Sequence, residues 1–198
     1  MKLSDFFTSL RIFLAPVFFI LFFFPIWTGY GSALSAVVLI PLFVFMEFTD
    51  FLDGYYARKH KAVSEFGKLF DPFADVLANM TVLFCFVLSG YLPAVFFLVL
   101  IYREMGIMFV RTLASRKGVA MGARKGGKLK TVLYIVASGF SLALESALRL
   151  GIDLGVYLQS AKMVNFSLYI LAVIVSIVSF IDYLVYFTTI GKDLKKPV

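Results

Sequence analysis

The sequence has very few of the residues that bind soft metals or form covalent cross-links. Its 198 residues include one cysteine and one histidine, which excludes an intramolecular disulfide. Cys85 lies in an apolar run, where the expected role is that of a small buried hydrophobic side chain. A metal cluster rich in nitrogen or sulfur is excluded for the same reason. A metal site in this chain would therefore use oxygen ligands.

Charge is also scarce. Only 16% of the residues are charged and 61% are hydrophobic, a composition that excludes a soluble domain. It predicts a single all-α integral membrane domain over residues 1–198. The formal net charge is +7, but the basic residues are dispersed over short connections between apolar runs. This pattern is typical of cytoplasmic loops that face anionic lipid, and it does not predict nucleic-acid binding.

The apolar runs predict six transmembrane helices, preceded by a short amphipathic segment at residues 2–10 that would lie at the membrane interface. The predicted spans cover residues 12–26, 34–57, 65–88, 92–114, 127–148 and 164–190. Most lysines and arginines then fall on one side of the membrane, which we expect to be cytoplasmic. The prediction is a multi-pass protein of the cytoplasmic (inner) membrane, with both termini and the site described next on the cytoplasmic side.

Four of the scarce acids gather in the stretch of residues 50–75. They are Asp50, Asp53, Asp71 and Asp75. At 3.6 residues per turn, each pair falls on one stripe of a helix, and the two stripes can face each other. Four carboxylates in an apolar setting repel one another unless cations neutralise them, and two divalent ions balance four negative charges. The pattern predicts a site for two divalent cations, with Mg²⁺ or Mn²⁺ favoured by the oxygen ligands.

Small residues share these stripes. Gly54 and Ala57 are in line with the first pair of acids, and Gly67 is in line with the second. We expect a ligand to approach the helix backbones there, although tight helix packing in the membrane is an alternative reason for small residues. Simple ion pairing of the acids with nearby lysines and arginines would not require small residues at this register.

The stretch resembles the signature of the CDP-alcohol phosphotransferase family, D-x2-D-G-x2-A-R-x8-G-x3-D-x3-D, at every fixed position. The resemblance implies a polytopic membrane enzyme, expected to be a homodimer, that transfers a phosphoalcohol from a CDP-linked donor to an acceptor hydroxyl and releases CMP. It implies that Asp75 takes the proton from that hydroxyl. The residues it assigns to donor binding are Gly54, Ala57, Arg58, Gly67 and Thr8.

A second group of residues predicts an anion site. Arg103 and Arg111 are eight residues apart and share one face of the fourth predicted span, while Lys128 enters the fifth from the cytoplasmic side. Two guanidinium groups and an ammonium suit the phosphate of an acceptor. The alternative is that Arg103 simply pairs with Glu104 or Asp182.

The block of residues 102–131 resembles that of bacterial phosphatidylglycerophosphate synthases, whose acceptor is glycerol 3-phosphate. It implies CDP-diacylglycerol and glycerol 3-phosphate as substrates, with the lipid bilayer as surroundings. Two positions outside this block depart from the pattern of these synthases. Their usual N-terminal motif is Pro-Asn-x-x-Thr-x-x-Arg, of which this chain keeps Thr8 and Arg11 but has Asp5 in place of the Asn, and Val76 stands where a Lys usually follows the last Asp of the signature. Another acceptor, such as serine or inositol phosphate, therefore remains an alternative, as does a divalent-cation transporter.

Overall fold

The computed structural model describes the backbone of residues 3–60, 65–116, 119, 121 and 125–193, and the side chains of residues 6–49, 52, 70–116, 119, 121 and 126–189. Every regular element in this part of the chain is a helix. The helices are α1 (Leu3–Thr28), α2 (Ser32–His60), α3 (Glu65–Leu88), α4 (Ala94–Arg116), α5 (Lys125–Arg149) and α6 (Tyr157–Asp193). The predicted all-α fold is confirmed.

α1 runs without interruption from Leu3 through the first span, so the described part of the predicted amphipathic segment is the first part of this helix. One predicted boundary needs correction. α6 begins at Tyr157 rather than at residue 164, which shortens the connection after α5. At about 1.5 Å per residue, the 37 residues of α6 exceed the length needed to cross a hydrocarbon core of about 30 Å.

Five of the helices in the described part of the chain are long and apolar enough to cross a membrane, which makes the chain a multi-pass membrane protein. The helix that does not meet this criterion is α4, although it has 23 residues. Any window of 18 residues in α4 contains Arg103, Glu104 and Arg111, which is too much charge for a lipid-facing span. The predicted number of six crossings is therefore not established by length and composition alone.

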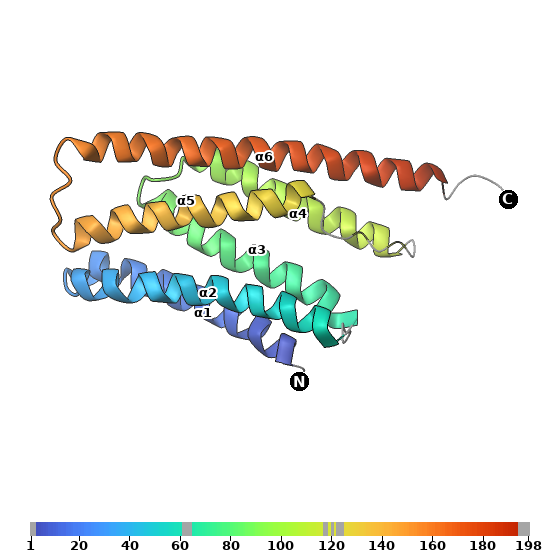
Figure 1. Cartoon of the computed structure of the whole chain (residues 1–198), viewed down its shortest axis with the longest axis horizontal. Helices are drawn as coiled ribbons and strands as arrows, with labels where there is room; N and C mark the ends of the chain where they lie inside the picture. The colour runs from blue at the N-terminus through green and yellow to red at the C-terminus, as the bar shows by residue number, and fades with distance from the viewer. Residues whose placement is uncertain (1–2, 61–64, 117–118, 120, 122–124, 194–198) are drawn as a thin grey trace.

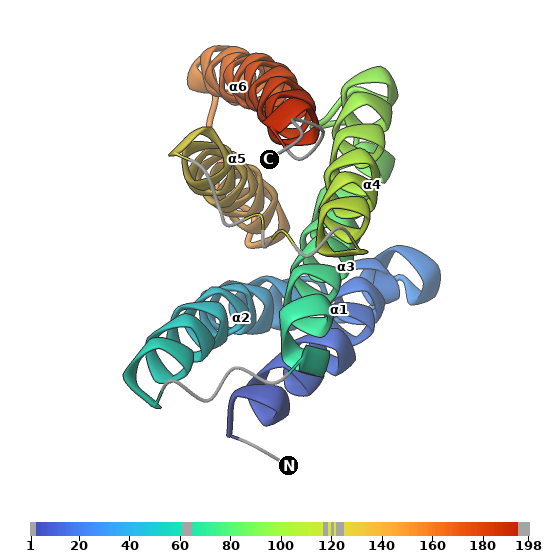
Figure 2. The same cartoon turned by 90° about the vertical axis from the view of Figure 1, so that its right-hand side faces the viewer.

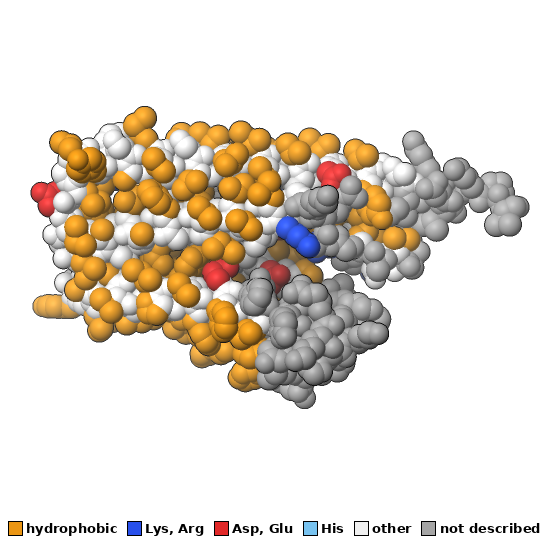
Figure 3. Space-filling model, in the orientation of Figure 1, with side chains coloured by type: hydrophobic (Ala, Val, Ile, Leu, Met, Phe, Trp, Pro, Cys, Tyr) orange, Lys and Arg blue, Asp and Glu red, His pale blue; other side chains and the backbone are white. Residues whose placement is uncertain are grey.

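The helices form an elongated bundle in which α1 packs on both α2 and α3, and α6 packs on both α4 and α5 (Figure 1). The view along the bundle separates these two groups, with α3 contacting α4 and α5 between them (Figure 2). α1 begins and α6 ends at the same end of the bundle (Figure 1). Hydrophobic side chains cover much of the described lateral surface, as expected for helices that face lipid (Figure 3).

A buried polar network joins the helices at the opposite end. Arg149, at the end of α5, donates from Nε to Glu145 Oε1 at 2.7 Å and from Nη1 to Ser35 Oγ of α2 at 2.7 Å. The Tyr91 hydroxyl, from the turn after α3, donates to Glu145 Oε2 at 2.9 Å. Burial, and then the Glu145 carboxylate, raises the pKa of Tyr91, so the phenol remains a neutral donor. This network ties α2, α5 and the α3–α4 turn together at the end remote from the predicted site.

Helices α5 and α6 approach closely where α5 begins. A Cβ atom on Gly126 would lie 3.1 Å from Ser179 Cβ and 3.5 Å from Ser179 Cα. Gly139, farther along α5, has room, because its nearest neighbour would be a Phe43 ring carbon at 3.7 Å. Gly126 is thus a packing requirement and Gly139 is not.

We expect Gly126→Ala to lower the free energy of unfolding by about 1–3 kcal/mol, because the added methyl group would force α5 and α6 apart. Gly139→Ala is the matched control and should leave stability unchanged or raise it by up to about 1 kcal/mol, since alanine favours the helix. Denaturation of the two purified variants in mixed micelles measures the difference. Equal stability of the two variants would show that the close approach at Gly126 is not required.

Candidate functional site

The two described acids of the predicted metal site lie on α3 and are bound by side chains of α1. Thr8 Oγ1 donates to Asp71 Oδ1 at 2.9 Å. Arg11 Nη1 donates to Asp75 Oδ1 and forms an ion pair with it. Thr8 and Arg11 are buried, whereas the Asp75 side chain is 42% exposed. α1 therefore fixes the orientation of both carboxylates while leaving Asp75 accessible.

The other predicted residues of this stretch lie on the same two helices, but their side chains are outside the described residues. The structure places Asp50, Asp53, Gly54, Ala57 and Arg58 on α2, and Gly67 on α3. No group of three metal-ligating side chains occurs among the side chains that are described, which include only two of the four acids. The described part still fits a hard divalent ion, because Asp71 and Asp75 stand in line on α3 and offer carboxylate oxygens.

Next to Asp75 lies a cavity of about 180 Å³ that the predicted acceptor residues also line. Arg103 and Arg111 reach it from α4, and Lys128 reaches it from α5. Residues that are 28 to 53 positions away from Asp75 in the sequence thus meet it at one hollow. Four basic side chains and two carboxylates line this cavity, Lys130 and Glu104 being the further two, and the balance favours an anion with two negative charges.

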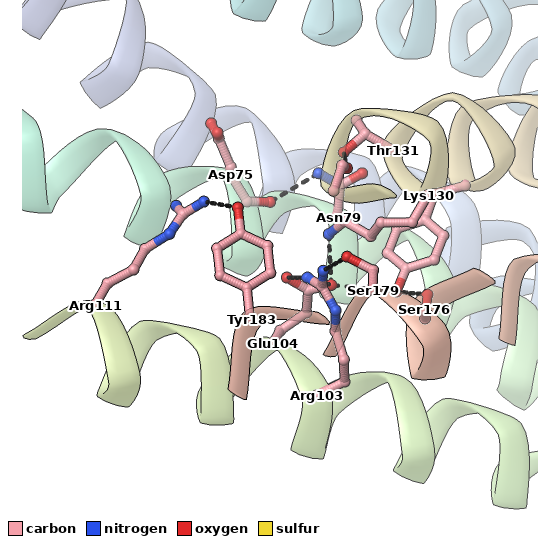
Figure 4. Close-up of polar contacts among 12 residues, drawn as sticks. Asp75, Asn79, Arg103, Glu104, Arg111, Lys130, Thr131, Ser176, Ser179 and Tyr183 are labelled. Atoms are coloured by element: carbon pink, nitrogen blue, oxygen red, sulfur yellow. Dashed lines mark hydrogen bonds and ion pairs between the residues drawn. The ribbon is translucent and has the colours of Figure 1, made fainter. Parts of the chain in front are cut away.

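Glu104 binds two of these cations. Arg103 Nη1 donates to both Glu104 carboxylate oxygens at 3.0 Å, and Lys130 Nζ donates to Oε1 at 2.5 Å (Figure 4). The side chains of Arg103 and Glu104 are 5% and 6% exposed, so the pair is shielded from water. The pairing of Arg103 with Glu104 that the sequence left open does occur. Arg103 makes this ion pair and also lines the cavity.

Hydroxyl groups complete this buried cluster. Tyr134 of α5 donates to Glu104 Oε1 at 3.2 Å, its hydroxyl is 3.0 Å from Ser176 Oγ of α6, and Lys130 Nζ lies 4.6 Å from the centre of its ring. Arg103 Nη2 donates to Ser179 Oγ at 2.9 Å. The cluster therefore connects α4, α5 and α6.

Arg111 is held differently. Its Nη2 donates to the hydroxyl of Tyr183 at 2.8 Å, and its guanidinium carbon lies 5.3 Å from the centre of the Tyr183 ring (Figure 4). Tyr183 is buried and also lines the cavity. Among the described residues, the partner of Arg111 is thus a neutral hydroxyl and not a carboxylate.

The sequence analysis did not predict Glu104 and Lys130 as residues of the site, although the sequence around each of them could have indicated it. Glu104 directly follows Arg103 in an apolar run, and Lys130 is two residues after Lys128. Ser176, Ser179 and Tyr183 could not have been found, because α6 is apolar on all sides and only packing against α4 and α5 selects these hydroxyls.

The comparison with protein families agrees with this arrangement. The family model described as CDP-alcohol phosphatidyltransferase matches residues 1–178. The chain belongs to this family of transferases.

Several curated relatives are similar over most of the chain. A protein of Treponema pallidum (strain Nichols) named CDP-diacylglycerol–glycerol-3-phosphate 3-phosphatidyltransferase is 41% identical, over 97% of this chain and 92% of the relative. The Bacillus subtilis (strain 168) protein of the same name is 35% identical, over 66% of this chain and 70% of the relative. A probable phosphatidylglycerophosphate synthase of Mycobacterium tuberculosis (strain CDC 1551 / Oshkosh) is 35% identical, over 74% of this chain and 69% of the relative.

The buried cluster makes a prediction about stability. Glu104→Gln keeps the shape of the side chain but removes the charge that Arg103 and Lys130 share, and we expect it to lower the free energy of unfolding by about 3–5 kcal/mol. Adding Lys130→Met should recover part of the loss, because one uncompensated cation is then absent. Detergent denaturation of the single and double variants measures both effects. If the effects of the two substitutions on the free energy of unfolding are fully additive, Glu104 and Lys130 do not interact.

Proposed function

We propose that this chain transfers the phosphatidyl group of CDP-diacylglycerol to glycerol 3-phosphate, giving phosphatidylglycerol phosphate and CMP. The observation that carries the proposal is the cavity in which Arg103, Arg111 and Lys128 lie with Asp75, because it puts positive charge for an acceptor phosphate beside a carboxylate of the family signature. The names of the similar proteins point to the same pair of substrates.

In the proposed reaction, the acceptor hydroxyl oxygen attacks the phosphorus atom of the phosphatidyl group. Asp75 takes the proton from that hydroxyl, and the bond between phosphorus and the bridging oxygen breaks, so that CMP leaves with the electron pair. Asp50, Asp53, Asp71 and Asp75 would hold two divalent cations, Mg²⁺ or Mn²⁺, which when bound neutralise the negative charge of the donor pyrophosphate. Thr8 and Arg11 hold Asp71 and Asp75 from α1, which limits the freedom of these two carboxylates.

Donor binding is assigned to the residues of the signature and to α1. Gly54, Ala57 and Gly67 would let cytidine and pyrophosphate approach the helix backbones, and Arg58 would offer a charged donor. Thr8 is included because of its place in the N-terminal motif. Its hydrogen bond to Asp71 keeps it beside the signature acids.

We further propose that all six helices cross the membrane, with the site on the cytoplasmic side, the amphipathic first residues at the interface, and two copies forming a homodimer. The charges of α4 support its crossing, since Arg103 and Glu104 are buried in the bundle and are not offered to lipid. The common location of the start of α1 and the end of α6 supports an even number of crossings (Figure 1).

The experiment that tests the function supplies CDP-diacylglycerol labelled in its lipid part, in mixed micelles with Mg²⁺ or Mn²⁺, together with glycerol 3-phosphate, serine or inositol phosphate in turn. With glycerol 3-phosphate, we expect labelled phosphatidylglycerol phosphate and one CMP per product molecule. With serine or inositol phosphate, we expect no labelled product. A product with serine or inositol phosphate would replace the acceptor assignment. Uptake of divalent cations into proteoliposomes without release of CMP would contradict the transferase reaction.

Replacing the proposed base should stop the chemistry. We expect Asp75→Asn to reduce kcat to a few per cent of wild type or less, because an amide cannot accept the proton. Binding of CDP-diacylglycerol, measured separately by titration, should be largely retained. Asp153→Asn, in the exposed connection between α5 and α6, is the matched control and should be fully active. Substantial turnover by the Asp75→Asn variant would show that Asp75 is not the general base.

Replacing Arg111 or Lys128 should affect the KM for the acceptor and not the KM for the donor. Loss of one charged hydrogen bond to a phosphate costs about 1.5–3 kcal/mol, roughly ten- to a hundredfold in affinity. Arg111→Ala and Lys128→Ala should therefore raise the KM for glycerol 3-phosphate by this factor while the KM for CDP-diacylglycerol changes little. Lys162→Ala, an exposed lysine on α6, is the control. Equal effects on both substrates would argue against an acceptor phosphate at this cavity.

A further inference from the structure

Two hydroxyl groups of α6 bond the two arginines that line the cavity from α4. They belong to Ser179 and Tyr183, which are one helical turn apart and both almost fully buried. Ser179 Oγ accepts from Arg103 Nη2 at 2.9 Å, and the Tyr183 hydroxyl accepts from Arg111 Nη2 at 2.8 Å. Hydroxyls four residues apart on α6 thus bind two arginines that are eight residues apart on α4.

We infer that Ser179 and Tyr183 are positioning residues that hold the two guanidinium groups of the acceptor subsite in place, so that α6 completes this subsite. The inference rests on the proposed function, because it assumes that Arg103 and Arg111 serve the acceptor phosphate. It concerns a part of the chain beyond residue 178, where the match to the family model ends.

The geometry at Arg111 supports the inference most strongly. Arg111 has four rotatable side-chain bonds and, among the described residues, no carboxylate that would fix it. The Tyr183 ring and hydroxyl together restrict it, since the guanidinium carbon lies 5.3 Å from the ring centre while Nη2 bonds the hydroxyl. Its Nε–H is buried and has no hydrogen-bond partner in the described part of the chain. A restrained guanidinium with an unused donor is suited to bind an anion without first paying the entropy of ordering.

Ser179 plays the corresponding part at Arg103. Glu104 binds one terminal nitrogen of Arg103 and Ser179 binds the other, which fixes the plane of the guanidinium group. Ser179 can pack this closely on α5 because Gly126 has no side chain, and a Cβ there would lie 3.1 Å from Ser179 Cβ. A Cβ on Gly127 would lie 3.5 Å from the Tyr183 hydroxyl, an ordinary contact, so the close approach is specific to Gly126.

The test compares two tyrosine-to-phenylalanine variants on the same helix. Tyr183→Phe keeps the ring over Arg111 and removes only the hydroxyl. Tyr169→Phe is the matched control, because Tyr169 is also fully buried on α6 and its hydroxyl bonds Ser141, away from the cavity residues. Both variants lose a buried hydrogen bond, so a general loss of stability affects them alike.

We expect Tyr183→Phe to raise the KM for glycerol 3-phosphate by about three- to tenfold, less than the loss of Arg111 itself, because the hydroxyl acts through the arginine. The KM for CDP-diacylglycerol should stay within about twofold, and kcat should be largely retained. Tyr169→Phe should change neither KM. Ser179→Ala should shift the acceptor KM in the same direction as Tyr183→Phe.

Three outcomes decide the inference. An unchanged acceptor KM in Tyr183→Phe, or equal shifts for Tyr183→Phe and Tyr169→Phe, would overturn it. If Tyr183→Phe does not fold, Ser179→Ala decides alone, and an unchanged acceptor KM overturns the positioning role. Arg111→Ala in the same assay separates this failure from that of the proposed function: if it raises the acceptor KM while the hydroxyl variants do not, the acceptor site stands and only the role of α6 is wrong.

Discussion

The structure depends on the neutralisation of charge inside a bundle whose outer surface is apolar. A cation buried among hydrophobic helices is very costly unless an acid and further hydrogen bonds compensate it. Arg103 and Lys130 meet this requirement through one carboxylate, Glu104, whose position on α4 lets both α5 and α6 contribute to the same cluster. The polar cluster thereby determines which faces of these three helices must point inward, a choice that the apolar sequence of α6 leaves open.

Buried positive charge is compensated differently at the two ends of the bundle. At the remote end, Arg149 forms an ion pair with Glu145 and a hydrogen bond with Ser35. Its guanidinium carbon lies 4.4 Å from the centre of the Phe22 ring. Side chains of α1, α2 and α5 therefore compensate its charge. At the site end, Arg111 is held by the phenol of Tyr183, with no carboxylate partner among the described side chains. A neutral partner does not offset the guanidinium charge as a carboxylate does, so among the described contacts Arg111 is better suited than Arg149 to bind an anion.

The sequence predicted the parts of the site that follow from periodicity along one helix. The register of the acids on α3 and the shared face of Arg103 and Arg111 on α4 are properties of a single helix. The contacts of Thr8 with Asp71, and of Arg111 with Tyr183, join segments 63 and 72 residues apart and depend on how helices pack. Helix packing cannot be deduced from apolar sequences that lack a distinct polar face, and the same lack of pattern explains why the start of α6 was predicted too late.

The arrangement also separates two tasks between the halves of the bundle. The acids of the signature lie on α2 and α3, and the described ones are held by α1, whereas the basic side chains of the cavity come from α4 and α5 and are held by α6. The two halves meet along α2 and α5 and also at the cavity, which Asp75 and Asn79 of α3 line together with Arg103 and Arg111 of α4. The described acids and the basic side chains therefore have different supporting helices, α1 for the acids and α6 for Arg103 and Arg111. A fold built in this way can retain one phosphoryl-transfer chemistry while the charge of the acceptor pocket is varied.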